Sequence, residues 1–224
     1  MMLCGLHGSC KETHPSIVQD QATEYWYENN IRRSGASRII EYHEQNRASP
    51  DSAVRAVFGE WANFKGNKKW EYFMNTGPRK VHELAARDRV KTLDESELSE
   101  LIYNTHSAKA HARQMRKVDL GDVGKTTSQD ERCRLFAVYL LRQRSQLGLG
   151  VCGVLNYVLW ENEVTPDVAE RIWNASHDSK WKLPHLGQNV LSEILGYARP
   201  DDFPPRNGRV SKTLYALGFD NIAY

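Results

Sequence analysis

The sequence lacks the features that would place it in a membrane or a secretory pathway. No apolar run approaches the roughly 20 residues that a membrane-spanning helix needs. The first residues, MMLCGLHGSCKETH, show no basic start followed by an apolar stretch. The four cysteines include no CxxC pair, which favours reduced thiols in a reducing compartment. We therefore expect a cytoplasmic protein that has no membrane partner.

The sequence also has little net charge and no clear strand pattern. The formal net charge is only +2, so any affinity for nucleic acid must come from local basic surfaces. No segment of convincing length alternates polar and apolar residues in the manner of a half-buried strand. Apolar residues instead recur at helical spacing, as Val54, Val57, Phe58 and Trp61 do. The sequence therefore predicts an all-α fold.

The polar stretch DLGDVGKTTSQD at 119–130 is the best candidate for a linker. It predicts an N-terminal helical lobe at 1–118 and a C-terminal helical lobe at 119–224, either around a cleft or fused into one continuous domain. GDVGKTT resembles the end of a phosphate-binding loop, but Asp119 stands where that loop needs its first glycine, and no buried strand precedes it. We therefore expect no bound nucleotide, and we predict no other cofactor.

Capping residues predict where two of the helices begin. Thr92 and Glu95 form a capping-box pattern ahead of the apolar residues of 98–102. Thr165 is expected to cap the helix in TPDVAERIWNAS, with Pro166 at its first position.

One cluster near the N-terminus contains metal-ligand types. Cys4, His7, Cys10 and His14 supply the four thiol and imidazole groups that a tetrahedral zinc site uses. The loops between them are very short, however, whereas structural zinc sites usually take their ligands from two separated elements. We therefore predict no metal site, and this cluster is the weak candidate for one.

Three consecutive aromatic residues, Tyr25, Trp26 and Tyr27, stand in the predicted helix EYWYENN. Neighbours on a helix point about 100° apart, so these three rings cannot all face one core. At least one is expected to be exposed or to line a cleft, where it could stack on a nucleobase.

The stretch LPHLGQNVLSEIL at 183–195 fits a hairpin of two short helices joined by a tight turn. Leu183 and Leu186 are expected to anchor the turn, and Gly187 to permit its bend. A hairpin of this kind points backbone N–H groups and a helix N-terminus at a phosphate. The second helix is expected to start near Gln188 and to bury its apolar side chains, namely Val190, Leu191, Ile194 and Leu195.

This stretch and the loop after it resemble the helix-hairpin-helix DNA glycosylase superfamily, whose signature runs LPGVGxKxAxxxL and then VDxHxxR. On that pattern Asn189 takes the place of the catalytic lysine of bifunctional members. Asn207 takes the place of the catalytic aspartate, and 207 − 189 gives the family's own spacing of 18 residues. His185 replaces the first hairpin glycine, and Leu191 replaces a small residue. Because both catalytic positions are amides, a lyase step through Asn189 is excluded, and Asn207 can orient a water or a sugar but supplies no charge.

The resemblance implies a helix-hairpin-helix glycosylase-like fold, with the hairpin at 183–197, and a monofunctional enzyme. Such an enzyme excises a damaged or modified base flipped out of double-stranded DNA, as in defence against phage. The missing carboxylate would come from Asp201 or Asp202, beside Asn207 and Asn189. Four rings would line the base pocket: Tyr25, Trp26, Tyr27 and Trp181. Seven residues would contact the DNA backbone: Lys182, Gly187, Gln188, Asn189, Arg206, Arg209 and Lys212.

Two alternatives to an enzyme stay open. The chain could be a catalytically silent helix-hairpin-helix module that recognises DNA in a restriction or defence system. It could also be a helical protein-interaction adaptor whose hairpin match is accidental. A carboxylate in a cleft opposite the hairpin would favour the enzyme, and a shallow or plugged cleft would favour the recognition module.

Overall fold

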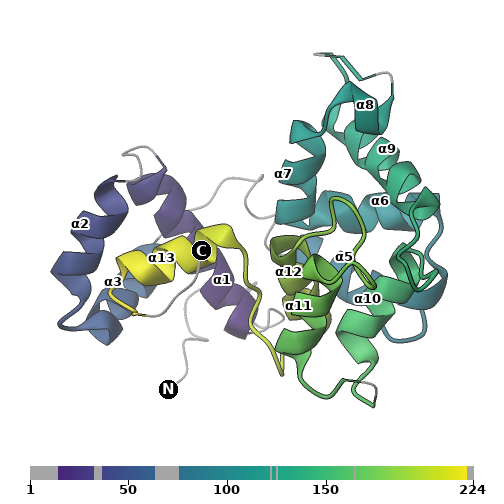
Figure 1. Ribbon diagram of the computed structural model, residues 1–224. Helices are drawn as coiled ribbons and strands as arrows, with labels where there is room; N and C mark the ends of the chain where they lie inside the picture. The colour runs from purple at the N-terminus through teal and green to yellow at the C-terminus, as the bar shows by residue number, and fades with distance from the viewer. Residues whose placement is uncertain are drawn as a thin grey trace. The chain divides into compact units, whose positions relative to one another are not determined.

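The computed structural model describes residues 15–32, 37–63, 76–121, 123–124, 126–163 and 165–220, and the regular secondary structure of these residues is helical. These residues form 12 α-helices together with one π-helical and one 3-10 turn, and they contain no strand (Figure 1). The all-α prediction is therefore confirmed. None of the described helices has the length and the apolar composition to cross a membrane.

The chain divides into two compact units. The first combines Met1–Asn75 with Pro200–Tyr224, and the second is Thr76–Arg199. The loop at 119–130, the linker candidate, lies inside the second unit rather than between the two. The reason is that a helix well before it, α6 (Glu95–Asn104), and the helix that follows it, α9 (Gln129–Arg142), pack against each other.

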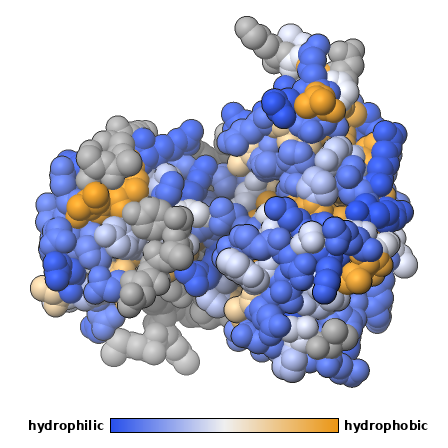
Figure 2. Space-filling model, viewed as in Figure 1, coloured by the Kyte–Doolittle hydropathy of each residue, from blue (hydrophilic) through white to orange (hydrophobic). Residues whose placement is uncertain are grey.

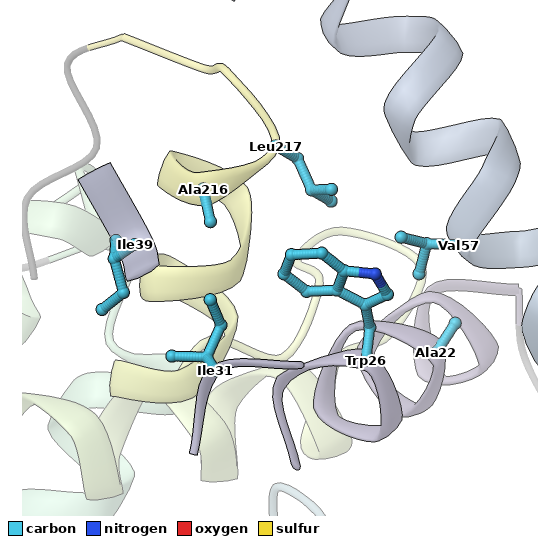
Figure 3. Close-up of a cluster of buried hydrophobic side chains, with 7 residues drawn as sticks. All are labelled: Ala22, Trp26, Ile31, Ile39, Val57, Ala216 and Leu217. Carbon is cyan, nitrogen blue, oxygen red and sulfur yellow. The ribbon is translucent and has the colours of Figure 1, made fainter. Parts of the chain in front are cut away.

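The first unit brings the C-terminal helix onto the N-terminal ones. Its helices are α1 (Pro15–Trp26), η2 (Tyr27–Ile31), α2 (Ser37–Asn46), α3 (Pro50–Ala62) and α13 (Gly208–Ala216). Trp26 is only 6% exposed, and Figure 3 shows its ring at the centre of the buried cluster, between side chains from the other helices. The remaining members of this cluster are Ala22, Ile31, Ile39, Val57, Ala216 and Leu217.

Polar contacts and one glycine fix the end of α13 against α2. A ring nitrogen of His43 lies 2.8 Å from the carbonyl oxygen of Tyr215, and the side-chain amide of Asn46 donates to the carbonyl oxygen of Ala216 at 3.0 Å. Gly218 has a φ of +94°, and a Cβ there would lie 2.6 Å from the carbonyl carbon of Asn46. Only glycine combines this backbone conformation with so close an approach.

The second unit is built around α12 (Gln188–Ala198). This helix contacts α5 (Gly77–Leu84), α7 (His106–Gln114), α10 (Val151–Trp160) and α11 (Val168–His177). Its apolar side chains Val190, Leu191, Ile194 and Leu195 are all buried, as the sequence predicts. The unit is completed by η3 (Val90–Thr92), α6, α8 (Lys117–Leu120) and α9.

A buried carboxylate joins α12 to α7. Glu193 is fully buried, and it accepts hydrogen bonds from the backbone N–H groups of His106 at 2.7 Å and Ser107 at 2.8 Å. The hydroxyl of Ser107 donates to the same carboxylate. A negative charge at this place satisfies the free N–H groups of the first turn of α7 and complements the helix dipole.

The capping box of α6 lies two residues later than predicted. Asp94 rather than Thr92 is the N-cap, and its carboxylate accepts from the N–H of Glu97 at 2.9 Å. The side chain of Glu97, not that of Glu95, accepts from the N–H of Asp94 at 3.1 Å. Thr92 belongs to the 3-10 turn η3, which ends before the helix begins.

The predicted cap of α11 is also displaced by two residues. Asp167 is the N-cap, and its carboxylate accepts from the N–H of Ala169 at 2.8 Å. The carbonyl oxygens of Thr165 and Pro166 instead accept from the guanidinium of Arg171, which is 1% exposed. The cap prediction at Thr165 is therefore wrong, because the residues before Asp167 serve to enclose this buried cation.

Candidate nucleic-acid interface

In the second unit two consecutive helices and their connection form a hairpin, but its first helix ends at His177 and not within 183–195 as predicted. It consists of α11, the connection at 178–187 and α12, which begins at Gln188 as expected. Leu183 is 0% exposed and Leu186 is 3% exposed, so both anchor the connection in the core. Their burial leaves the polar residues of the connection at the surface, and Lys182 is exposed.

The tip of the hairpin presents three backbone N–H groups that have no acceptor. Gly187, Gln188 and Asn189 are exposed, and Gly187 is an N-cap without a side-chain cap. Within the part of the chain that the structure describes, the N–H groups of these three residues make no hydrogen bond. The first turn of α12 contains no acidic side chain. Three free donors at a helix N-terminus suit an anionic oxygen.

The bend of the hairpin depends on His185 rather than on Gly187, which corrects the prediction. His185 has a φ of +66°, and it is the only non-glycine among the described residues with a positive φ. Gly187 has φ −92° and ψ 173°, an extended conformation that any residue adopts. A Cβ at Gly187 would meet nothing within 4 Å. A side chain at Gly187 would therefore project into open space.

The imidazole of His185 contacts three helices of the same unit. Its Nδ1 lies 2.9 Å from Nε2 of His111 on α7, and its Nε2 lies 3.6 Å from a carboxylate oxygen of Asp119 on α8. The ring of Tyr139 on α9 meets it edge-on, with 5.4 Å between the ring centres. We call Asp119, His185 and His111 the histidine chain.

The environment of His111 disfavours its charged form. Burial lowers the pKa of His111 below its ordinary value, and the neighbouring His185 lowers it further, while Asp119 acts in the opposite direction. Burial and the charge of Asp119 also raise the pKa of Tyr139. The same carboxylate therefore acts on side chains from two different helices.

The lowered pKa of His111 predicts that the folded protein loses stability in mild acid. As the pH falls through 6.5, the ordinary pKa of histidine, His111 binds a proton in the unfolded chain but stays neutral in the folded chain. The stabilisation is therefore complete above this pH and is lost progressively below it. Thermal unfolding from about pH 7.5 to about pH 5 should show a steeper fall in Tm for the wild type than for His111→Gln, which does not titrate. Parallel curves for the two proteins would contradict this prediction.

Asn207 begins α13 in the first unit and is 3% exposed. Its side-chain oxygen accepts from the N–H groups of Arg209 at 2.9 Å and Val210 at 3.1 Å. Its amide nitrogen donates to the carboxylate of Glu24 at 2.7 Å. Both ends of the side chain are therefore engaged in capping the helix and in holding it against α1. Asn189, the other amide of the predicted catalytic pair, is exposed in the first turn of α12.

The remaining predicted polar residues lie on and after the turn that follows α12. Asp201, Asp202 and Arg206 are exposed, and Lys212 is half-buried on α13. Arg209 forms an ion pair with Glu28 at 2.6 Å, so its charge is already balanced within the first unit.

The four predicted pocket rings each pack against a neighbouring side chain of their own unit. Trp26 is wrong as a pocket residue, because it fills the core of the first unit and meets the ring of Tyr42 edge-on. Tyr25 packs on Trp61, with 5.5 Å between ring centres. Tyr27 lies beneath the guanidinium of Arg209. Trp181 belongs to the second unit, where it stacks on Tyr157 at 3.7 Å. Each ring thus has a partner within its own unit.

The cluster Cys4, His7, Cys10 and His14 lies outside the described residues. Among the residues that are described, no group of three or more histidine, cysteine or acidic side chains is arranged to hold a metal ion.

The histidine chain is the part of this surface that sequence patterns miss. His111 and His185 are 74 residues apart, so no local spacing links them. The only feature of the sequence that points to this contact is His185, which stands where the helix-hairpin-helix superfamily has a glycine.

Comparison with known proteins adds no relative. No protein-family model matches the chain, and neither a curated protein nor a solved structure matches it.

Proposed function

We propose that this chain binds double-stranded DNA through the tip of the hairpin, residues 182–189. The observation that supports this proposal is the set of three exposed N–H groups without acceptors at Gly187, Gln188 and Asn189. They would bind a backbone phosphate, and the exposed ammonium of Lys182 would add a long-range attraction. The stretch that builds this tip is also the one that resembles the helix-hairpin-helix superfamily.

We further propose that the chain recognises DNA without chemistry at Asn207. Both polar atoms of that side chain are occupied by the cap of α13 and by Glu24. An amide used in this way is not available to position a water or a sugar. The resemblance then reflects a hairpin that binds backbone phosphates in a recognition module, as in a restriction or defence system.

Base excision is the second candidate, and the placement of two carboxylates favours it. Asp201 and Asp202 are exposed in the turn directly after α12, within the loop that carries the catalytic aspartate in the resembling family. In this case the chain would be a monofunctional DNA glycosylase, and one of these carboxylates would stabilise the positive charge that develops on the sugar.

A protein-interaction adaptor receives less support. The exposed large hydrophobic side chains among the described residues are Ile40, Val118, Leu147 and Trp173, and they come from three different helices and the connection between α9 and α10. In the view of Figure 2, hydrophilic residues cover most of the described surface, and the hydrophobic ones form small separate patches. An adaptor is expected to expose a larger continuous apolar area.

Gly187→Val tests the DNA-binding proposal. The substitution fits the backbone conformation and the open space at this position, so the fold should be unaffected. Its branched side chain would stand where a phosphate must approach, and we expect the affinity for a short duplex to fall at least about tenfold. Fluorescence anisotropy measures the affinity, and Lys91→Gln, on η3, is the matched surface control. An affinity for DNA that is equal in wild type and Gly187→Val would contradict the proposal.

The same samples separate recognition from base excision. Duplexes with damaged, modified and phage-derived bases are incubated with the protein and then probed for aldehydic abasic sites. Recognition alone predicts binding without abasic sites. Abasic sites made by the wild type but not by Asp201→Asn or Asp202→Asn would establish the glycosylase instead.

A further inference from the structure

The hairpin tip is held by side chains that are not themselves expected to touch DNA. His185 stands two residues before Gly187, and its backbone occupies the left-handed region at φ +66°, which a histidine adopts only at a cost. Its imidazole, however, bonds to His111 and faces Asp119. These contacts offset the unfavourable backbone conformation and thereby fix the direction of the residues that follow.

The bond between the two imidazoles requires a particular protonation state. His111 Nε2 and His185 Nδ1 lie 2.9 Å apart, so one ring must donate a proton and the other must accept it. With both rings neutral, His185 can direct its Nε2–H at Asp119 and accept at Nδ1 from His111. One added proton leaves this arrangement possible, because Asp119 balances the charge. A second added proton removes the last acceptor, and the bond between the rings is lost.

Few groups around this hydrogen bond can balance a positive charge on the two imidazoles. His185 faces His111 from α7, Asp119 from α8 and the ring of Tyr139 from α9. His111 also packs against the apolar ring of Phe136. Asp119 is therefore the one carboxylate that is seen to face the pair in the described residues, and it can balance one positive charge but not two. The side chains of His185 and Asp119 are only 28% and 19% exposed, so water screens them weakly.

We propose that the histidine chain positions the DNA-binding hairpin, and that proton uptake by both imidazoles releases it, so that the hairpin loses its affinity for DNA in mild acid. His185, His111 and Asp119 are positioning residues in this mechanism. This inference rests on the proposed DNA binding. Its expected direction is opposite to the simple effect of added positive charge, which would strengthen the attraction to phosphates as the pH falls.

Four variants distinguish the effect of the backbone conformation at His185 from the effect of the contacts between the imidazoles. His185→Gly removes the imidazole but adopts a positive φ freely, so its affinity for DNA should not fall in acid. His185→Ala lacks both the ring and this freedom and should bind weakly at every pH. His111→Gln can still donate to His185 and cannot be protonated, so its affinity should not depend on pH. His111→Leu should bind weakly at every pH.

Affinity for one short duplex is measured between about pH 7.5 and about pH 5 at constant ionic strength. The wild type should lose about tenfold in affinity across this range, and His185→Gly and His111→Gln should lose none. A wild type that binds equally well or more tightly in acid would overturn the inference. The same fall in His185→Gly as in the wild type would also overturn it.

A second measurement tests the inference without DNA. Hydrogen exchange of the bonded backbone amides of Leu186, Val190 and Leu191 reports the opening of the hairpin directly. Exchange in the wild type should accelerate in mild acid beyond the intrinsic effect of pH, and His185→Gly should show no such acceleration. Accelerated exchange in a protein that binds no duplex would contradict the proposed DNA binding but support the opening of the hairpin in acid. Unchanged exchange in a protein that binds DNA would contradict only the opening of the hairpin in acid.

Discussion

Glu193→Ala is expected to lower the free energy of unfolding by about 4 kcal/mol, because it removes a buried charged acceptor from three donors at once. The donors are the N–H groups of His106 and Ser107 and the hydroxyl of Ser107. Alanine would leave these part-buried donors without this acceptor and would open a cavity between α12 and α7. Urea unfolding followed by circular dichroism measures the loss.

Two further variants give this prediction its controls. Glu193→Gln keeps the volume and one acceptor oxygen but lacks the charge at the start of α7, so a loss of about 2 kcal/mol is expected. Glu170→Ala removes an exposed carboxylate from α11 and should change stability by less than about 0.5 kcal/mol. If Glu193→Ala were as stable as Glu170→Ala, the account of how α12 is joined to α7 would be wrong.

Gly218→Val is expected to destabilise the first unit by about 3 kcal/mol or more, since it combines a strained backbone with a collision. The φ of +94° disfavours any side chain, and the new Cβ would lie 2.6 Å from the carbonyl carbon of Asn46. Backbone atoms at this distance cannot rotate away, so the end of α13 would have to separate from α2. The hydrogen bond of Asn46 to Ala216 would then be lost.

Gly59→Ala is the matched control in the same unit. Gly59 lies in the last turn of α3, and a Cβ there would meet nothing within 4 Å. Alanine is the better helix former, so this variant should be more stable than the wild type by about 0.5–1 kcal/mol. Equal stability of the two glycine variants would show that the contact between Gly218 and α2 does not form in solution.

The sequence predicts those features that depend on neighbouring residues. The apolar residues of 183–195 recur at helical spacing, so the start of α12 and the burial of Leu183 and Leu186 follow from them. Local patterns were less decisive where two of them overlapped. TLDESE contains two capping-box patterns in different registers, and the helix uses the one that begins at Asp94.

Features that join distant segments could not be predicted. Asn46 and Ala216 are 170 residues apart, so nothing in the local pattern indicates that the C-terminal helix completes the first unit. Asn207 was expected to face a substrate because of its spacing from Asn189, yet its burial depends on Glu24 in α1. The contact of His185 with His111 depends in the same way on how α7 packs beside the hairpin.

The most direct test of the central claim is the response of individual backbone amides to DNA. In a nitrogen-resolved NMR titration with a short duplex, the amide signals of Gly187, Gln188 and Asn189 should shift first and furthest. Their shifts should saturate with one common Kd, which should weaken as salt is added. Binding that shifts amides of other surfaces and leaves these three unchanged would contradict the claim that the hairpin is the DNA-binding site.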